Sequence, residues 1–162
     1  MHVDTPAFQD LSHLEGNCYG CGRHHPSGLR IKSHWHDDGI HVIAHHTPRE
    51  EFAGWPGLVY GGLLAMLVDC HGNWTAIAHH YRAEARTPGS QPDIFCVTAH
   101  LGIDYLKPTP MDRPLTLRAR VDGETGRKTR VLCEVLAGDE LTARADCLFV
   151  RVDMARLKAG LG

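Results

Sequence analysis

The sequence lacks the features that mark nucleic-acid-binding and membrane-spanning proteins. Its 17 lysines and arginines are outnumbered by 19 aspartates and glutamates, giving a formal net charge of -2 with neutral histidines. A nucleic-acid binder should instead carry a concentrated basic surplus. No apolar run approaches the roughly 18 residues that span a bilayer, and the opening MHVDTPAFQDLSHLEG has neither the basic nor the apolar region of a signal peptide. We therefore expect a cytoplasmic protein that binds neither nucleic acid nor membrane.

Low-complexity segments, internal repeats and strong metal signatures such as H-E-x-x-H are also missing, although the chain has 13 histidines. With 162 residues, 43% of them hydrophobic, the chain is long enough for one domain with a proper core. Four of the six cysteines lie in apolar helical or strand-like segments: Cys70, Cys96, Cys133 and Cys147. We interpret these four as small buried hydrophobic residues in a reducing compartment.

Hydrophobic periodicity predicts strands on both sides of one helix. Residues 28–36 and 40–47 alternate around an Asp-Asp-Gly turn and predict a hairpin. From Gly61 to about Tyr81 the apolar spacing is helical, and the helix is apolar around most of its circumference up to Asp69, so it should be buried. Short turns separate four further predicted strands, which we expect to form a meander: 94–106, 114–122, 128–137 and 140–152.

One buried helix among about six antiparallel strands predicts an α+β fold in which a curved sheet wraps around the helix. Because one helix cannot cover a whole sheet, we expect a second subunit to pair with the first. The predicted organisation is an irregular lead-in with a C-x-x-C sequence over 1–27, a single domain over 28–152 and a tail over 153–162.

A single carboxylate, Asp69, interrupts the apolar stretch GLVYGGLLAMLVDCHGNW. An unpaired buried charge costs several kcal/mol, so such a residue is usually partnered or functional. The positions on its helical stripe are all small: Gly62, Ala65, Gly72 and Ala76. This stripe either leaves room for a ligand or permits close helix packing.

The start of the helix favours a functional interpretation of Asp69. Gly61 and Gly62 expose backbone N–H groups at the positive end of the helix dipole, where an oxyanion would be stabilised. Two turns further on, Asp69 could act on the opposite side of the same carbonyl. A carboxylate and an oxyanion site indicate acyl transfer, with water as the natural acceptor.

The segment PGLVYGGLLAMLVD resembles the PaaI-like hotdog-fold thioesterases of the 4-hydroxybenzoyl-CoA thioesterase superfamily. In that family the helix opens with H-G-G and carries a catalytic carboxylate nine residues after the His, a spacing that here joins Tyr60 to Asp69. VTAHLGIDYLKPTP resembles the family's third strand and its Y-x-x-P segment, and NCYGCGRHHPSGLRI resembles the lead-in of a subgroup. The resemblance extends over roughly residues 17–152.

The resemblance implies an acyl-CoA thioesterase that needs no cofactor or metal and assembles as a homodimer or a dimer of dimers. Asp69 would be the general base or nucleophile, and the Gly61 N–H would polarise the thioester carbonyl. Thr98 would hold the attacking water, and because the family's active site lies at a dimer interface, it could meet Asp69 of the other subunit. Tyr60 replaces the family's His, and Gly54 stands where some members have Asn or Gln.

The sequence CYGC, Cys18 to Cys21, is followed by His24 and His25. Zinc accepts Cys and His at this spacing. No second C-x-x-C closes a four-ligand site, however, so we favour a metal-free glycine-rich loop and keep zinc as the alternative.

Further candidate substrate contacts are Gly62, His71, Arg127, Lys128 and Arg130. The three basic residues flank the turn GETG and form either a solvated hairpin or a clamp for the phosphates of coenzyme A. His71 is interpreted as a packing or hydrogen-bonding residue close to Asp69. Two other functions stay open: a non-catalytic acyl-CoA or acyl-group binding protein on the same fold, and a small zinc-dependent interaction module.

Overall fold

The computed structural model describes residues 5–14 and 16–160. Six strands form one antiparallel sheet in the order β1-β2-β4-β5-β6-β3. The strands are β1 (Ser33–Trp35), β2 (Val42–His46), β3 (Phe95–Tyr105), β4 (Leu115–Val121), β5 (Lys128–Ala137) and β6 (Glu140–Val152). The long helix is α2 (Gly61–Ala83), and the short helical elements are α1 (Phe8–Leu11), the 3-10 turn η1 (Glu50–Phe52) and α3 (Met154–Gly160).

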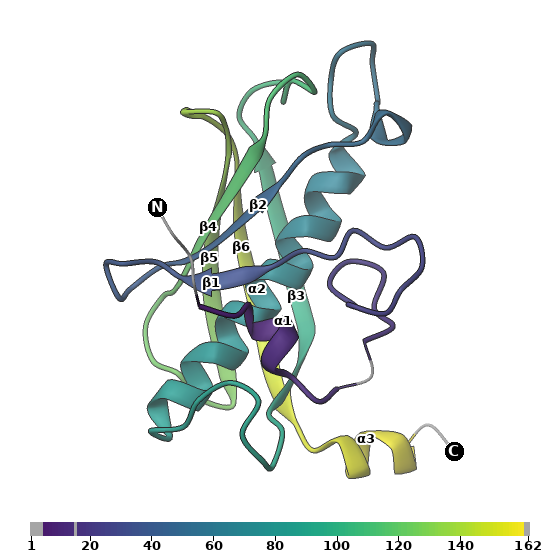
Figure 1. Ribbon diagram of the computed structural model, residues 1–162. Coiled ribbons are helices and arrows are strands. Elements are labelled where there is room, and N and C mark those ends of the chain that lie inside the picture. The colour runs from purple at the N-terminus through teal and green to yellow at the C-terminus, as the bar shows by residue number, and fades with distance from the viewer. Residues whose placement is uncertain (1–4, 15, 161–162) are drawn as a thin grey trace.

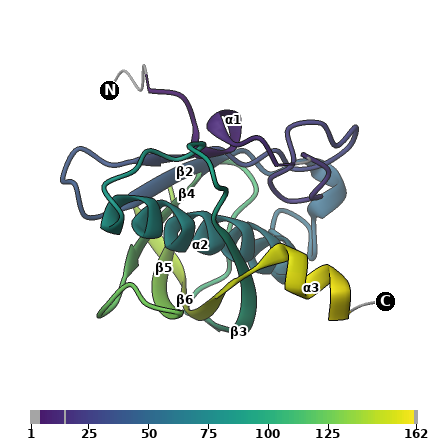
Figure 2. The same ribbon diagram turned by 90° about the horizontal axis from the view of Figure 1, so that it is seen from below.

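The sheet curves around α2, which fills its concave face (Figure 1). Figure 2 shows the helix along its whole length, with β2 and β4 on one side of it and β6 and β3 on the other. Leu63 and Leu67 of the helix are fully buried, as are Leu117 and Phe149 of the sheet. The predicted α+β hotdog fold, a curved sheet around one long helix, is therefore confirmed. In the described ranges, no helix combines the length and hydropathy that crossing a bilayer requires.

The expected four-strand meander is wrong at β3. β4, β5 and β6 are joined by hairpins and lie side by side, but β3 pairs with β6 at the sheet edge rather than with β4. The reason lies in the connection after β3, which the loop before α2 holds: the Val59 N–H donates to Thr109 O and the Met111 N–H donates to Gly57 O. These bonds direct the chain across the end of the sheet, past β6 and β5, instead of back along β3.

The first predicted strand is shorter than residues 28–36. Leu29 and Ile31 are buried as strand alternation suggests, but their N–H groups donate to the carbonyls of Tyr19 and Gly20 in the lead-in loop. Arg30 between them has φ of 52°, which interrupts an extended conformation. The carbonyls of the C-x-x-C loop thus accept hydrogen bonds from the N–H groups that a longer β1 would have used for strand pairing.

A buried polar chain fastens the lead-in to the domain, where the sequence predicted only irregular structure. Gln9 of α1 exchanges two hydrogen bonds with Ser33, of 3.0 and 2.9 Å. The Ser33 hydroxyl lies 2.9 Å from Nδ1 of His71, and Nε2 of the same ring lies 3.1 Å from Val42 O. Every one of these side chains is bonded, so a polar connection is stable inside the core.

Candidate active site

Asp69 and Thr98 meet where α2 passes the edge strand β3. Thr98 donates a hydrogen bond from Oγ1 to Oδ1 of the half-buried Asp69 carboxylate, at 2.6 Å. A β-bulge follows at once, because the register against β6 shifts between Thr98 and His100. Bulges bend a strand and redirect its side chains. The two residues that the resemblance paired are therefore in contact, but within one chain rather than across two subunits.

The start of α2 is covered by two tyrosines. Tyr60, the N-cap residue, lies over Gly62, where an added Cβ would come within 2.2 Å of the Tyr60 ring. Tyr105 donates from its hydroxyl to Gly61 O at 2.9 Å, and its ring would lie 3.3 Å from a Cβ on Gly61. Tyr60, in the position of the family's His, thus packs against the glycine pair. The Gly61 N–H, at the first position of the helix, has no intrahelical acceptor.

Gly61 and Asp69 of one chain are too far apart to act on one carbonyl. Asp69 follows Gly61 by eight positions, which is a rise of about 12 Å along the helix axis. A carbonyl bond is only about 1.2 Å long. The expectation that both groups of a single helix act on opposite sides of the same carbonyl is therefore wrong.

The stripe of small residues around Asp69 is used mainly for packing. A Cβ on Gly72 would lie 2.9 Å from the Phe149 ring, and Ala76 is fully buried. At the other end of the stripe the Tyr60 ring occupies the space beside Gly62. Close packing, the alternative left open by the sequence, is the correct interpretation at these positions.

The space next to Asp69 lies instead between α2 and the lead-in, in a cavity of about 250 Å³. Asn73, one turn after Asp69, lines the same cavity. Its Nδ2 donates to Cys96 O at 2.9 Å, whereas its Oδ1 is buried and has no hydrogen-bond partner among the described residues. The sequence reasoning missed Asn73. The available signal was its i+4 spacing from Asp69, which places both side chains on one helix face.

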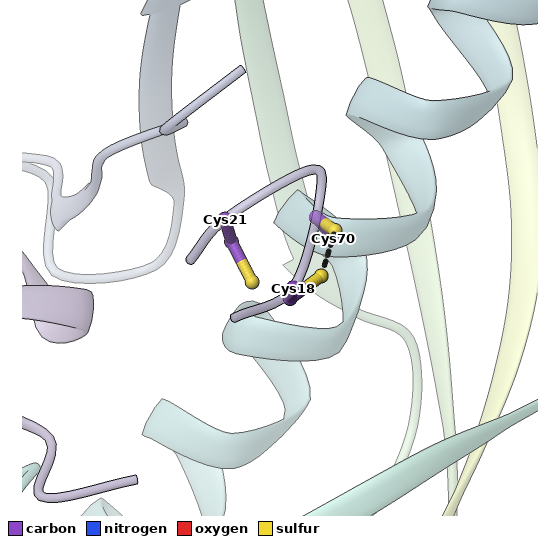
Figure 3. A group of neighbouring side chains, drawn as sticks. All are labelled: Cys18, Cys21 and Cys70. Atoms are coloured by element: carbon purple, nitrogen blue, oxygen red, sulfur yellow. Dashed lines mark hydrogen bonds between the residues drawn. The ribbon is translucent and has the colours of Figure 1, made fainter. Parts of the chain in front are cut away.

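Three cysteines line this cavity. Figure 3 shows them gathered where the lead-in loop passes α2. The Sγ atoms of Cys18 and Cys21 in the lead-in and of Cys70 in α2 all lie within 4.8 Å of one another, with 3.6 Å between Cys18 and Cys70. Cys70 is therefore no isolated hydrophobic residue, which corrects its interpretation; Cys96, Cys133 and Cys147 are buried as predicted.

The environment of the three thiols separates their pKa values. Hydrogen bonds from Cys21 and Cys70, with smaller contributions from the N–H groups of Cys21 and Gly20, hold the pKa of Cys18 far below its usual range. Hydrogen bonding to Cys18 raises the pKa of Cys21 to about 11. Hydrogen bonding to Cys18 and Cys21, followed by burial, strongly raises the pKa of Cys70. Of the three thiols, Cys18 is therefore the one that loses its proton most readily.

The two histidines proposed as zinc ligands with Cys18 and Cys21 make other contacts. Nε2 of His24 accepts a hydrogen bond from Arg23, and Nδ1 of His25 accepts one from the Ser27 N–H. In the described part of the chain, the group that could hold a metal ion consists of the three cysteines.

His71 does not reach the cavity. It is fully buried between Ser33 and Val42, and burial lowers its pKa to about 4. We therefore drop His71 from the candidate substrate contacts. Its position two residues after Asp69 turns its side chain to another face of the helix.

The basic residues at the GETG turn lie beside the last turn of α2. Arg127 borders a surface cavity of about 870 Å³ there, together with His80 and Arg151. Lys128 is exposed. Arg130 is held by two carboxylates, Asp146 at 2.6 Å and Asp122 at 2.7 Å. At the opposite end of the helix, Glu50 and Glu51 are exposed in η1.

Comparison with known proteins agrees with this architecture. Residues 56–144 match the family model described as the thioesterase superfamily. A thioesterase superfamily protein from Shewanella loihica PV-4 is 37% identical in sequence and superposes with a TM-score of 0.62 over 76% of this chain and 91% of that one. Thioesterase HI1161 from Haemophilus influenzae, at 13% identity, shares the fold, with a TM-score of 0.67 over 93% of each chain.

Among curated relatives, acyl-coenzyme A thioesterase THEM4 of Rattus norvegicus is 29% identical over 102 residues. That match includes 62% of this chain but only 38% of the relative. The similarity therefore concerns a part of the longer rat protein.

Proposed function

Because the chain belongs to the thioesterase superfamily, we propose that it is a thioester hydrolase that cleaves an acyl-CoA to a free acid and coenzyme A. The observation that carries this proposal is the contact between Thr98 and Asp69 beside a cavity. A carboxylate held by a hydroxyl at the wall of a cavity is the arrangement that a general base for water requires.

In the proposed reaction, Asp69 takes a proton from a water molecule whose oxygen attacks the thioester carbonyl carbon. Thr98 donates to Oδ1, which leaves Oδ2 as the proton acceptor. The carbonyl oxygen gains negative charge in the tetrahedral intermediate, and a backbone N–H at a helix start stabilises that charge. When the intermediate collapses, the C–S bond breaks, coenzyme A leaves as a thiolate, and the proton held by Asp69 neutralises it.

We assign the oxyanion donor to Gly61 of a second copy of the chain, since Gly61 of the same chain lies about 12 Å away along the helix. β3 is at the sheet edge. Along this strand, Thr98 is hydrogen-bonded to Asp69 and Tyr105 is hydrogen-bonded to Gly61. Antiparallel pairing of two β3 edges about a twofold axis between Leu101 and Gly102 would place Thr98 of each copy opposite Tyr105 of the other. Each dimer would then contain two sites, and in each of them Asp69 and Thr98 of one copy would face Gly61 of the other.

The substrate proposal includes the basic turn. Coenzyme A carries several phosphate charges, and exposed cations such as Arg127 and Lys128 are suited to bind them. Arg130 is less suited because Asp122 and Asp146 already bind its guanidinium. A cytoplasmic location and the choice between a dimer and a dimer of dimers remain predictions from the sequence.

The activity is tested by measuring free thiol released from a panel of acyl-CoAs by the wild type and by Asp69→Asn. We expect release from at least one substrate and a loss of about 10²- to 10⁴-fold in kcat in the variant. Tight acyl-CoA binding without release from any substrate would support the alternative, a non-catalytic binding protein. Release that Asp69→Asn leaves unchanged would show that the proposed base is wrong.

The shared site is tested with proline and alanine at Gly61. Proline removes the N–H at a helix position that tolerates it, and Tyr60 before it has a compatible extended conformation. Alanine adds the same Cβ beside Tyr105 but keeps the donor. We expect Gly61→Pro to lower kcat by about 10²-fold or more relative to Gly61→Ala.

A mixed dimer of Asp69→Asn and Gly61→Pro chains then distinguishes a site shared between two copies from a site within one chain. If each site takes Asp69 from one copy and Gly61 from the other, the mixed dimer has one intact site and regains about half of the wild-type rate. A site within one chain would be damaged in both copies, so the mixed dimer would stay inactive.

A further inference from the structure

The conformation of the lead-in loop places two cysteines against α2. The Gly22 N–H donates to Cys18 O at 2.7 Å and closes a tight turn. Gly20 lies directly on the helix, where an added Cβ would come within 2.3 Å of Cys70 Sγ. Only a residue without a side chain lets the loop approach this closely. The convergence of Cys18, Cys21 and Cys70 is therefore a consequence of the loop conformation.

The spacing of the three sulfurs is close to that around a tetrahedral metal ion. Zinc–thiolate bonds of about 2.3 Å at the tetrahedral angle separate the sulfurs by about 3.8 Å. Cys18 and Cys70 are 3.6 Å apart, and all three sulfurs lie within 4.8 Å of one another. Shifts of about an ångström or less would bring each sulfur to bonding distance from a common centre.

We propose that Cys18, Cys21 and Cys70 bind one zinc ion through three thiolates. A disulfide would join two of these residues and leave the third without a role, whereas a metal ion engages all three. Thiolate ligands in a tetrahedral arrangement select zinc over the hard cations that prefer oxygen. Water completes the coordination, because no fourth histidine, cysteine or carboxylate joins the group in the described residues.

Binding the ion releases the protons that the free thiols carry, since metal ligands must be deprotonated. The charge of the ion would favour the thiolate form of all three cysteines. The bound ion would tie the lead-in to α2 at the residue directly after Asp69. It would thereby fix one wall of the cavity that Asp69 and Asn73 line.

The test uses the full chain, reduced with a non-chelating phosphine, stripped of metal and titrated separately with Zn²⁺ and Co²⁺. We expect uptake of one ion per chain and, with Co²⁺, the charge-transfer absorption of cobalt–thiolate bonds. Cys18→Ser and Cys70→Ser should each weaken uptake at least tenfold. Cys96→Ala is the matched control, because Cys96 lines the same cavity but lies outside the cluster, and it should bind as the wild type does.

A second measurement needs no variant. Zn²⁺ should slow alkylation of Cys18, Cys21 and Cys70 in the wild type, as located by peptide mass spectrometry, and leave Cys133 and Cys147 unaffected. Failure of the reduced wild type to take up either ion, or uptake that both serine variants leave unchanged, would overturn the proposal. Neither readout depends on thioester hydrolysis, so this inference and the proposed activity fail or succeed separately.

Discussion

At the scale of single residues, the candidate site depends on a few side chains with defined partners. Asp69 has Thr98 as its hydrogen-bond donor and Asn73 as its neighbour on the helix face. The buried Oδ1 of Asn73 has no partner in the described residues, and a buried acceptor of this kind is normally satisfied by water or a ligand. A water molecule bound between these groups would lie where the proposed reaction needs it.

Thr98→Ala should lower kcat by about 10- to 100-fold, because a hydrogen bond to a charged group contributes roughly 1.5–3 kcal/mol. Thr98→Ser keeps the hydroxyl and should retain most of the activity. Steady-state kinetics on the same acyl-CoA compares the two variants. If alanine and serine at this position are equally active, the hydroxyl has no part in the reaction.

His71 makes the stability of the fold depend on pH. Its pKa of about 4 in the folded protein lies below the usual 6.5 because the ring is fully buried. As the pH falls below 6.5, the unfolded chain binds a proton that the folded protein resists, so the free energy of unfolding decreases by about 1.4 kcal/mol per pH unit. The decrease stops near pH 4, after a total of about 3 kcal/mol.

His71→Asn should remove this part of the pH dependence, although it also weakens the protein at neutral pH by changing buried hydrogen bonds. Urea unfolding at pH 7.5, 6 and 5 measures the slope. The exposed His13 provides the control, and His13→Asn should keep the wild-type slope. Parallel slopes for the wild type and His71→Asn would contradict the assignment.

At the scale of elements, α2 is where sequence and structure agree most closely. The sequence predicts a helix from Gly61 to about Tyr81, and the observed helix ends only two residues later, at Ala83. The prediction is accurate because the apolar periodicity is strong and the glycines mark a clear start. The strands β3 to β6 lie within one residue of their predicted bounds. β1 is shorter than predicted, since the lead-in loop accepts hydrogen bonds from the N–H groups of Leu29 and Ile31. The local sequence of residues 28–31 does not reveal this contact with the loop.

Gly72 on α2 provides a test of the helix–sheet packing. Alanine there gains about 1 kcal/mol in helix propensity, but its Cβ would lie 2.9 Å from the buried Phe149 ring. Overpacking costs about 1–3 kcal/mol, so we expect a net loss of about 1 kcal/mol in the free energy of unfolding. Urea denaturation measures it.

Phe149→Leu makes room for the added methyl group. In the Gly72→Ala background it should therefore cost less than it does alone, and a double-mutant cycle should give a favourable coupling energy. Additive effects would mean that the two side chains do not compete for space.

At the scale of the whole molecule, the substrate extends beyond the reacting carbonyl. Double substitution of Arg127 and Lys128 by alanine should raise KM for acyl-CoA by up to about fivefold per charge, since an exposed ion pair contributes up to ~1 kcal/mol. KM for the acyl-N-acetylcysteamine thioester, which has no phosphates, should stay unchanged. Arg130→Ala is the comparison, with a smaller effect because two carboxylates already bind Arg130.

Added salt should raise KM for acyl-CoA in the wild type and reduce the difference between the wild type and the double variant, because screening weakens exposed charge pairs. An equal rise of KM for both thioesters would place the effect of Arg127 and Lys128 at the acyl group or in the fold, and would rule out a phosphate clamp.

The sequence by itself determined the elements and one half of the site. Periodicity along the chain predicts the helix and most strands, and a lone carboxylate in an apolar helix singles out Asp69, because both signals are local. Only the tertiary structure decided that Thr98 meets Asp69 within one chain, and that Gly72 meets Phe149 and Cys18 and Cys21 meet Cys70 across long separations. Those contacts depend on strand order and loop paths, which burial and backbone hydrogen bonding fix for the whole chain at once.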